Sequence, residues 1–168
     1  NLRIPFDFAA WRANTPGAGS GASANGDGDL YPDLLEFALG GLPDSGASPA
    51  GNAVSLVESN GQVSLVVNRP SGLSGITYEV ETSANLANWQ TAPSGTGTTS
   101  LVFANLQNQP GLSADAGFAR LRVRTATESV VTLPFGWLAT SFSAGSRTVG
   151  VPFRQSPVFS SSVVSSTS

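Results

Sequence analysis

The hydrophobic pattern of the chain changes across residues 42–52, a stretch rich in Pro, Gly and Ser. Before this stretch, apolar residues recur three or four positions apart, as on one face of a helix. After it, they alternate with polar residues, as on a strand. The pattern therefore predicts a short helical unit that a linker joins to a β-rich region.

Residues 1–14 predict the first helical segment. An extended lead is followed by one or two helical turns, with Asp7 as the capping residue and Phe8 and Trp11 on one face. Residues 15–24 are small and form a predicted flexible loop.

A second apolar stripe predicts a helix over residues 33–39, with its leucines packed on the two aromatic residues of the first. Pro32 suits the first helical position, and Gly40-Gly41 marks the end.

The alternating region begins with a predicted hairpin, in which Asn60-Gly61 joins strands at Ala53–Glu58 and Gln62–Arg69. Further strands are predicted at Ile76–Glu81, Trp89–Ala92, Ser100–Leu106 and Phe118–Thr125. Turn-rich segments separate them, which is typical of an antiparallel β-sandwich.

The last part of the chain has a third character. It predicts strands at Val130–Pro134, Gly136–Phe142, Thr148–Phe153 and Val158–Val164. A few strands alone would leave edges unpaired, so they either complete the sandwich of their own chain or pair with a neighbouring subunit. We therefore divide the chain into residues 1–45, 46–127 and 128–168.

Charged residues also alternate along two of the strands. Glu79 and Glu81 share one face of their strand, and Arg120, Arg122 and Arg124 share one face of theirs. If the two strands pair, these residues form a cross-strand ladder whose pairs each contribute under about 1 kcal/mol. An arginine stripe for an anionic glycan is the alternative, and we favour the ladder.

The acidic stretch at residues 25–36 carries the strongest chemical signal. Its oxygen donors have the spacing of a twelve-residue calcium loop, with a backbone carbonyl at the seventh position. The predicted ligands are Asn25, Asp27, Asp29, Tyr31, Asp33 and Glu36. Leu30 stands where such loops have glycine, and the alternative is an acidic surface turn without a metal.

Composition removes most catalytic chemistry. The chain has no Cys and no His, and its 8 basic residues are all Arg. A Ser-His-Asp triad, a thiol nucleophile and a lysine-bearing phosphate loop are therefore excluded. The remaining acids form no pair typical of glycoside hydrolysis, so we expect no catalytic residues and no enzymatic activity.

Charge and hydropathy bear on partners and location. A net charge of -3 argues against binding nucleic acid, and no apolar run is long enough for a membrane span. Without Cys or Lys, calcium is the one cross-link available, and millimolar calcium indicates an extracellular or cell-surface setting. The chain begins at Asn1 rather than Met, which we interpret as processing or excision from something longer.

Two motifs resemble secreted proteins of verrucomicrobia and related bacteria. The first is the acidic loop followed by Leu-Leu-Glu-Phe-Ala-Leu-Gly at residues 34–40, and the second spans residues 78–89. The resemblance covers residues 5–125. It implies a dockerin-like or thrombospondin-type-3-like calcium loop before a small β-domain, with calcium at Asn25, Asp27, Asp29, Asp33 and Glu36 and an extracellular location. Asn85 stands where that pattern usually has Asp, which concerns a turn.

These observations predict a mainly β protein: an antiparallel β-sandwich preceded by a helix–calcium loop–helix unit. We expect a non-enzymatic, calcium-stabilised structural protein that self-assembles into a surface fibre or layer, a homo-oligomer or polymer joined by strand addition through its terminal strands. The alternative is a carbohydrate-binding or anchoring module of a larger exported protein. An exposed, coplanar set of Trp89, Trp137 and Tyr78 would favour that alternative.

Overall fold

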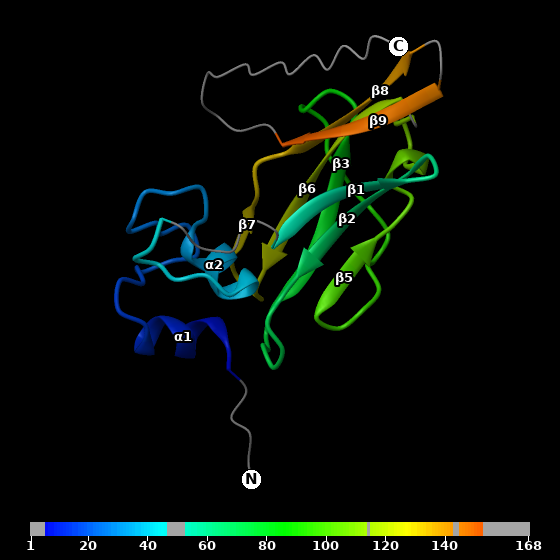
Figure 1. The fold of residues 1–168 in the computed structure, drawn as a ribbon. Coiled ribbons are helices and arrows are strands. Elements are labelled where there is room, and N and C mark those ends of the chain that lie inside the picture. Colours follow the sequence, from blue (N-terminus) through cyan, green and yellow to red (C-terminus); the bar gives the residue numbers. More distant parts are fainter. Residues whose placement is uncertain (1–5, 47–52, 114, 143–144, 153–168) are drawn as a thin grey trace.

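A computed structural model describes residues 6–46, 53–113, 115–142 and 145–152, with backbone alone from residue 139 onward. Figure 1 shows two twisted sheets with a small helical unit beside one end of them. Within the described residues, no helix is long and apolar enough to cross a membrane.

The helical unit contains α1 (Phe8–Asn14) and α2 (Asp33–Leu39), close to the predicted positions. As expected, Asp7 caps α1, because its Oδ1 accepts the Ala10 N–H at 2.8 Å. α2 ends at Gly40, whose left-handed φ of 81° suits a residue without a Cβ.

Aromatic rings hold the two helices together. Phe8 and Trp11 lie on one face of α1, as predicted, and their ring centroids lie 5.7 Å from that of Phe37. Phe37 was not part of the predicted stripe. Every residue of α2 is buried, because the helix lies between α1 and the β-rich region.

The β-rich region has two antiparallel sheets in the described residues. Its strands are β1 (Val54–Ser59), β2 (Gln62–Asn68), β3 (Thr77–Ser83), β4 (Gln90–Thr91), β5 (Ser100–Phe103), β6 (Ala116–Arg124), β7 (Ser129–Val131), β8 (Phe135–Phe142) and β9 (Gly145–Pro152). One sheet has the order β1-β2-β5, and the other has the order β4-β3-β6-β8-β9, with β7 beside β6.

The inner faces of the two sheets share one core. Val63, Leu65 and Val67 alternate inward from β2, and Leu121 and Val123 do so from β6; all belong to one cluster of buried apolar residues. This arrangement is sandwich-like, and it confirms the expected β-rich fold.

Local turns explain where the strands begin and end. Asn60 and Gly61 both have positive φ and join β1 to β2, as the Asn-Gly signal predicts. The strand expected at Ser100–Leu106 stops at Phe103, because Asn105 is left-handed (φ 57°) and a 3-10 turn follows at Leu106–Asn108.

The charge ladder forms as expected, because β3 pairs with β6 and places Glu79 opposite Arg122 and Glu81 opposite Arg120. Glu81 forms ion pairs with Arg120 and Arg122, each with an N···O distance of 2.8 Å. Glu79 forms an ion pair with Arg124 at 2.9 Å.

The strands after residue 128 extend the chain's own sheet as far as they are described. β8 pairs with β6 through residues 135–138 and 116–119, and β9 pairs with β8. The strand expected at Val158–Val164 lies outside the described residues.

The helical unit is joined to the β-rich region at several points. The Tyr78 hydroxyl on β3 donates to the Ala38 carbonyl of α2 at 2.6 Å. Before α1, Phe6 forms a bridge with Leu73, and the Ser74 N–H donates to the Phe6 carbonyl at 3.2 Å. These contacts fix the position of the acidic loop, which lies between the two helices along the chain.

Candidate metal centre

The acidic loop is folded by its own side chains. The Asn25 Oδ1 accepts the Gly28 N–H at 3.0 Å, and its Nδ2 donates to the Asp29 carbonyl at 2.8 Å. Asp27 Oδ1 accepts the Asp29 N–H at 3.2 Å, and Asp29 Oδ1 accepts the Tyr31 N–H at 2.5 Å. Such side-chain-to-backbone bonds stabilise consecutive tight turns in polar segments.

The loop does not take the backbone path of a standard twelve-residue calcium loop. Leu30, at the position where those loops have glycine, does not have a positive φ; its side chain is 47% exposed. Gly28 is left-handed instead, with φ 71°. The sharp turn therefore comes two residues earlier, which is how the loop accommodates a leucine.

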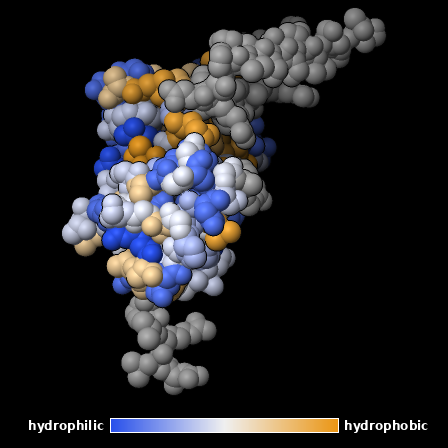
Figure 2. Space-filling model, turned by 90° about the vertical axis from the view of Figure 1, so that its left-hand side faces the viewer, coloured by the Kyte–Doolittle hydropathy of each residue, from blue (hydrophilic) through white to orange (hydrophobic). Residues whose placement is uncertain are grey.

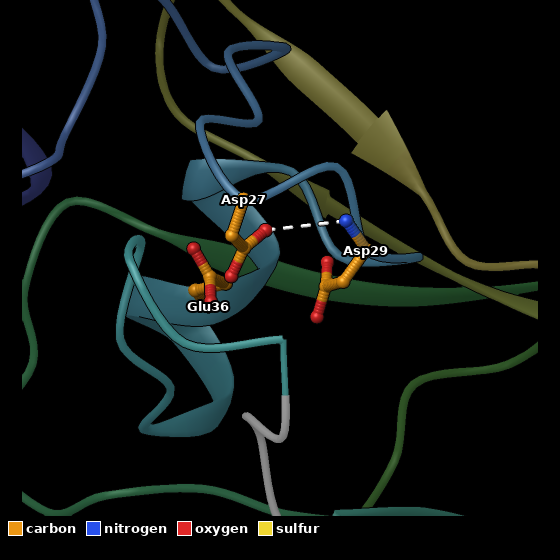
Figure 3. Close-up of side chains that lie close together, drawn as sticks. All are labelled: Asp27, Asp29 and Glu36. Carbon is orange, nitrogen blue, oxygen red and sulfur yellow. Dashed lines mark hydrogen bonds between the residues drawn. The ribbon is translucent and has the colours of Figure 1, made fainter.

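Three carboxylates meet where the loop returns to α2. Asp27 and Asp29 project from the loop and Glu36 from the helix, and each contributes an oxygen that lies within 4.8 Å of the others (Figure 3). Glu36 is only 1% exposed, because α2 is buried against the rest of the molecule. Glu36 thus lies on the buried side of the cluster, and the loop residues Asp27 and Asp29 lie on its more exposed side.

Three oxygens of this cluster have no hydrogen-bond donor. Both Glu36 oxygens and Asp27 Oδ2 are buried without a hydrogen-bond partner. A buried polar group without a partner costs on the order of 1–3 kcal/mol, and more when it is charged. A hard divalent cation, which prefers several oxygen ligands, would satisfy all of these atoms.

The electrostatics of the cluster agree with its geometry. Burial raises the pKa of Glu36 to about 8, and the negative charges of Asp27, Asp29, Asp33 and Asp44 add to the effect. Burial also raises the pKa of Asp29. Positive charge at this point, whether a proton or a metal ion, would relieve the repulsion.

The structure brings together three of the six predicted ligands. Asn25 is occupied with the backbone bonds described above. Asp33 is fully buried, but its Oδ2 accepts the Gly19 N–H at 2.5 Å and its Oδ1 has no partner. Tyr31 lies two residues after Asp29 in the loop and is half-buried. Asp33 therefore holds the preceding loop, a role that spacing alone did not indicate.

A further link runs from that preceding loop to the sheet. The Ala22 N–H donates to Glu128 Oε1 at 2.9 Å, and Glu128 lies in the turn between β6 and β7. The Leu34 N–H, at the start of α2, donates to the Ala22 carbonyl at 3.2 Å. The loop, the helix and the sheet are thus connected through one short segment.

Figure 2 shows the face that carries the helical unit. Its described surface is mainly hydrophilic to neutral, and apolar residues appear in small separate areas. The described part of this face therefore carries no broad apolar patch.

The aromatic residues do not form an exposed platform. Trp137 is 3% exposed, and its indole N–H donates to the Ser113 carbonyl. The Arg120 guanidinium covers the Trp89 ring at 4.0 Å from its centroid, and Tyr78 is half-buried. This placement counts against a carbohydrate site built from these three residues.

Comparison with known proteins identifies no relative: no family model, no curated protein and no solved structure matches the chain.

Proposed function

We propose that this chain is a non-enzymatic, calcium-binding structural module that acts outside the cell. The observation that carries the proposal is Glu36, a buried carboxylate with two unpartnered oxygens, one of which lies within 4.8 Å of an oxygen of Asp27 and of Asp29. Calcium suits this donor set because all of its ligands are oxygens and because it tolerates irregular geometry. Millimolar calcium outside the cell is enough for a site of modest affinity.

The ion would act as a structural staple. It would tie the loop to α2, and α2 is bonded to β3 through Tyr78 and Ala38. The segment before the loop is bonded to the β6–β7 turn through Ala22 and Glu128. A cation that orders the loop would therefore stabilise the contact between the helical unit and the sheet, and the buried α2 leaves little room for the opening movement of a calcium sensor.

Within this proposal, copies of the chain assemble into a surface fibre or layer by strand addition. The sequence feature behind this proposal is the strand predicted at Val158–Val164, which lies outside the described residues. Because β8 and β9 belong to the sheet of their own chain, residues 153–168 are the segment that we propose is donated.

The test measures metal binding and size on the full chain. Titration calorimetry with calcium should show binding, and scattering in millimolar calcium should show polymers that loosen in chelator. Absence of calcium binding would contradict the metal site. A compact monomer that binds calcium would keep the site but contradict assembly, and would favour the alternative of an anchoring module in a larger exported protein.

A further inference from the structure

The chain returns to the metal centre after α2. At the end of the helix, the Gly41 N–H donates to the Glu36 carbonyl at 2.7 Å, which reverses the chain direction. A second turn follows at once, because the Ser45 N–H donates to the Leu42 carbonyl at 3.2 Å. Asp44 occupies the third position of this turn.

This turn lies against the acidic loop. A Cβ added to Gly26 would be 3.3 Å from the Pro43 carbonyl oxygen, and one added to Gly46 would be 3.9 Å from the Asp29 Cβ. Figure 3 shows the segment after α2 passing beside Glu36 and Asp29 before its grey continuation. The residues on both sides of Asp44 are therefore in van der Waals contact with the loop or close to it.

The three clustered carboxylates leave a cation short of ligands. Calcium takes six to eight oxygens, and carboxylate count sets much of its affinity. Two predicted ligands each use a side-chain oxygen elsewhere: Asn25 Oδ1 accepts the Gly28 N–H, and Asp33 Oδ2 accepts the Gly19 N–H, which leaves Asp33 Oδ1 without a partner. A further acidic group from outside the loop would add oxygen ligands and negative charge to those of the three carboxylates.

Asp44 is free to be that group. Its side chain is exposed and makes no hydrogen bond or ion pair within the part of the chain that the structure describes. Its Cβ lies beside Gly17, where an added Cβ would be 3.0 Å away, and the Gly17 carbonyl oxygen lies against the acidic loop, 3.1 Å from a Cβ added to Gly26.

We propose that Asp44 is a calcium ligand contributed from outside the twelve-residue loop. The inference rests on the proposed function and deepens it. The ion would then bind residues before α2, within α2 and after α2. One metal would thus link the two segments that flank the helix to the helix itself.

The test is calcium titration of the full chain carrying Asp44→Asn. This variant keeps the side-chain size and removes one charge, and we expect its calcium Kd to rise about tenfold or more, because affinity follows ligand charge. The matched control is Asp115→Asn, which makes the same charge change at an exposed residue before β6 and should leave the Kd nearly unchanged. Equal Kd values for wild type and Asp44→Asn would overturn the inference while leaving the metal site in place.

Amide exchange gives a second readout. Calcium should slow exchange of the Ser45 N–H in the wild type, because the ion would hold its turn, and should slow it much less in Asp44→Asn. Wild type that binds calcium without protecting Ser45 would again contradict a ligand role for Asp44. Wild type that does not bind calcium at all would instead contradict the proposed function. Unchanged circular dichroism of the metal-free variant checks that it folds.

Discussion

Two groups of buried carboxylates in this molecule have opposite surroundings. On β3, Glu81 is 6% exposed and receives two guanidinium groups, each at 2.8 Å. On α2, Glu36 is 1% exposed and faces two aspartates, with no hydrogen-bond partner for either oxygen. Of these two buried carboxylates, only Glu81 is paired with a cation within the described residues.

The difference follows from how each group is built. Pairing of β3 with β6 places arginines opposite glutamates by register, so neutralisation comes with the sheet. In the described part of the helical unit, the basic residue is Arg12. Its guanidinium donates to the Ser20 carbonyl and lies over the Phe8 ring rather than beside the cluster. The ladder carboxylates are paired with arginines of the chain, although Arg122 Nε has no hydrogen-bond partner, whereas no ion pair is formed by Glu36 within the part of the chain that the structure describes.

The largest expected effect comes from calcium itself. At about 100 times its Kd, calcium should stabilise the folded chain by about 2.7 kcal/mol, because it binds the folded loop and not the unfolded chain. For a chain of this size, this corresponds to a rise in Tm of about 5–10 °C. Thermal unfolding followed by circular dichroism, with calcium and then with chelator, measures it. Identical Tm values would show that the loop does not need the ion.

The next effect is the pH dependence of the metal-free chain. The pKa of Glu36 is raised to about 8 in the folded state, against an ordinary value of 4.5, so the folded chain holds a proton that the unfolded chain has lost. This contribution to stability is fully present below about pH 4.5 and is lost as pH rises through about 8. Urea unfolding in chelator between these limits measures it.

Glu36→Gln is the control for that dependence. The neutral side chain should flatten the decline above pH 4.5 and abolish calcium binding, since it removes the central charge of the site. In calcium, the stability of the wild type should instead rise with pH, because calcium binding needs the ionised carboxylate and releases its proton. A decline that persists in Glu36→Gln would place the titrating group elsewhere.

A smaller effect is expected in the ladder. Glu81→Gln removes the shared partner of Arg120 and Arg122, whose side chains are 21% and 36% exposed, so we expect a loss of about 1–3 kcal/mol rather than the full cost of breaking a buried pair. The loss should be the same with calcium and with chelator. A calcium-dependent loss would show that the two groups of carboxylates are coupled.

The smallest effect is expected at the rim of the ladder. Glu79→Gln breaks the pair with Arg124, whose side chain is 50% exposed, and should cost under about 1 kcal/mol and less at high salt. Urea unfolding at two salt concentrations tests this. A cost as large as that of Glu81→Gln would mean that exposure does not set the strength of these pairs.

Short-range signals in the sequence predicted much of the fold. Asn60-Gly61 has the positive φ angles that its turn requires, and Asp7 and Gly40 cap their helices as expected. The ladder was also predictable, because side chains alternate strictly along a strand and only one pairing of charges is then favourable. In each case a few neighbouring residues determine the outcome.

The candidate metal centre was less predictable because its details depend on contacts between distant segments. Spacing identified Asp27, Asp29 and Glu36, which do lie together. It could not show that Asp33 would accept the N–H of Gly19, fourteen positions away. Nor could it show that the turn containing Asp44 would lie against the loop. Such contacts follow from the packing of α2, which a one-dimensional pattern does not contain.

The bridge between Phe6 and Leu73 has a mechanical consequence. A tensile load that enters the chain at Phe6 would pass directly into the segment between β2 and β3, bypassing α1, the acidic loop and α2. While this bridge holds, the helical unit with its candidate metal centre would carry less of the load. Calcium would govern the resistance of the helical unit to heat, while the force needed to extend the β-rich region would depend on the sheets alone.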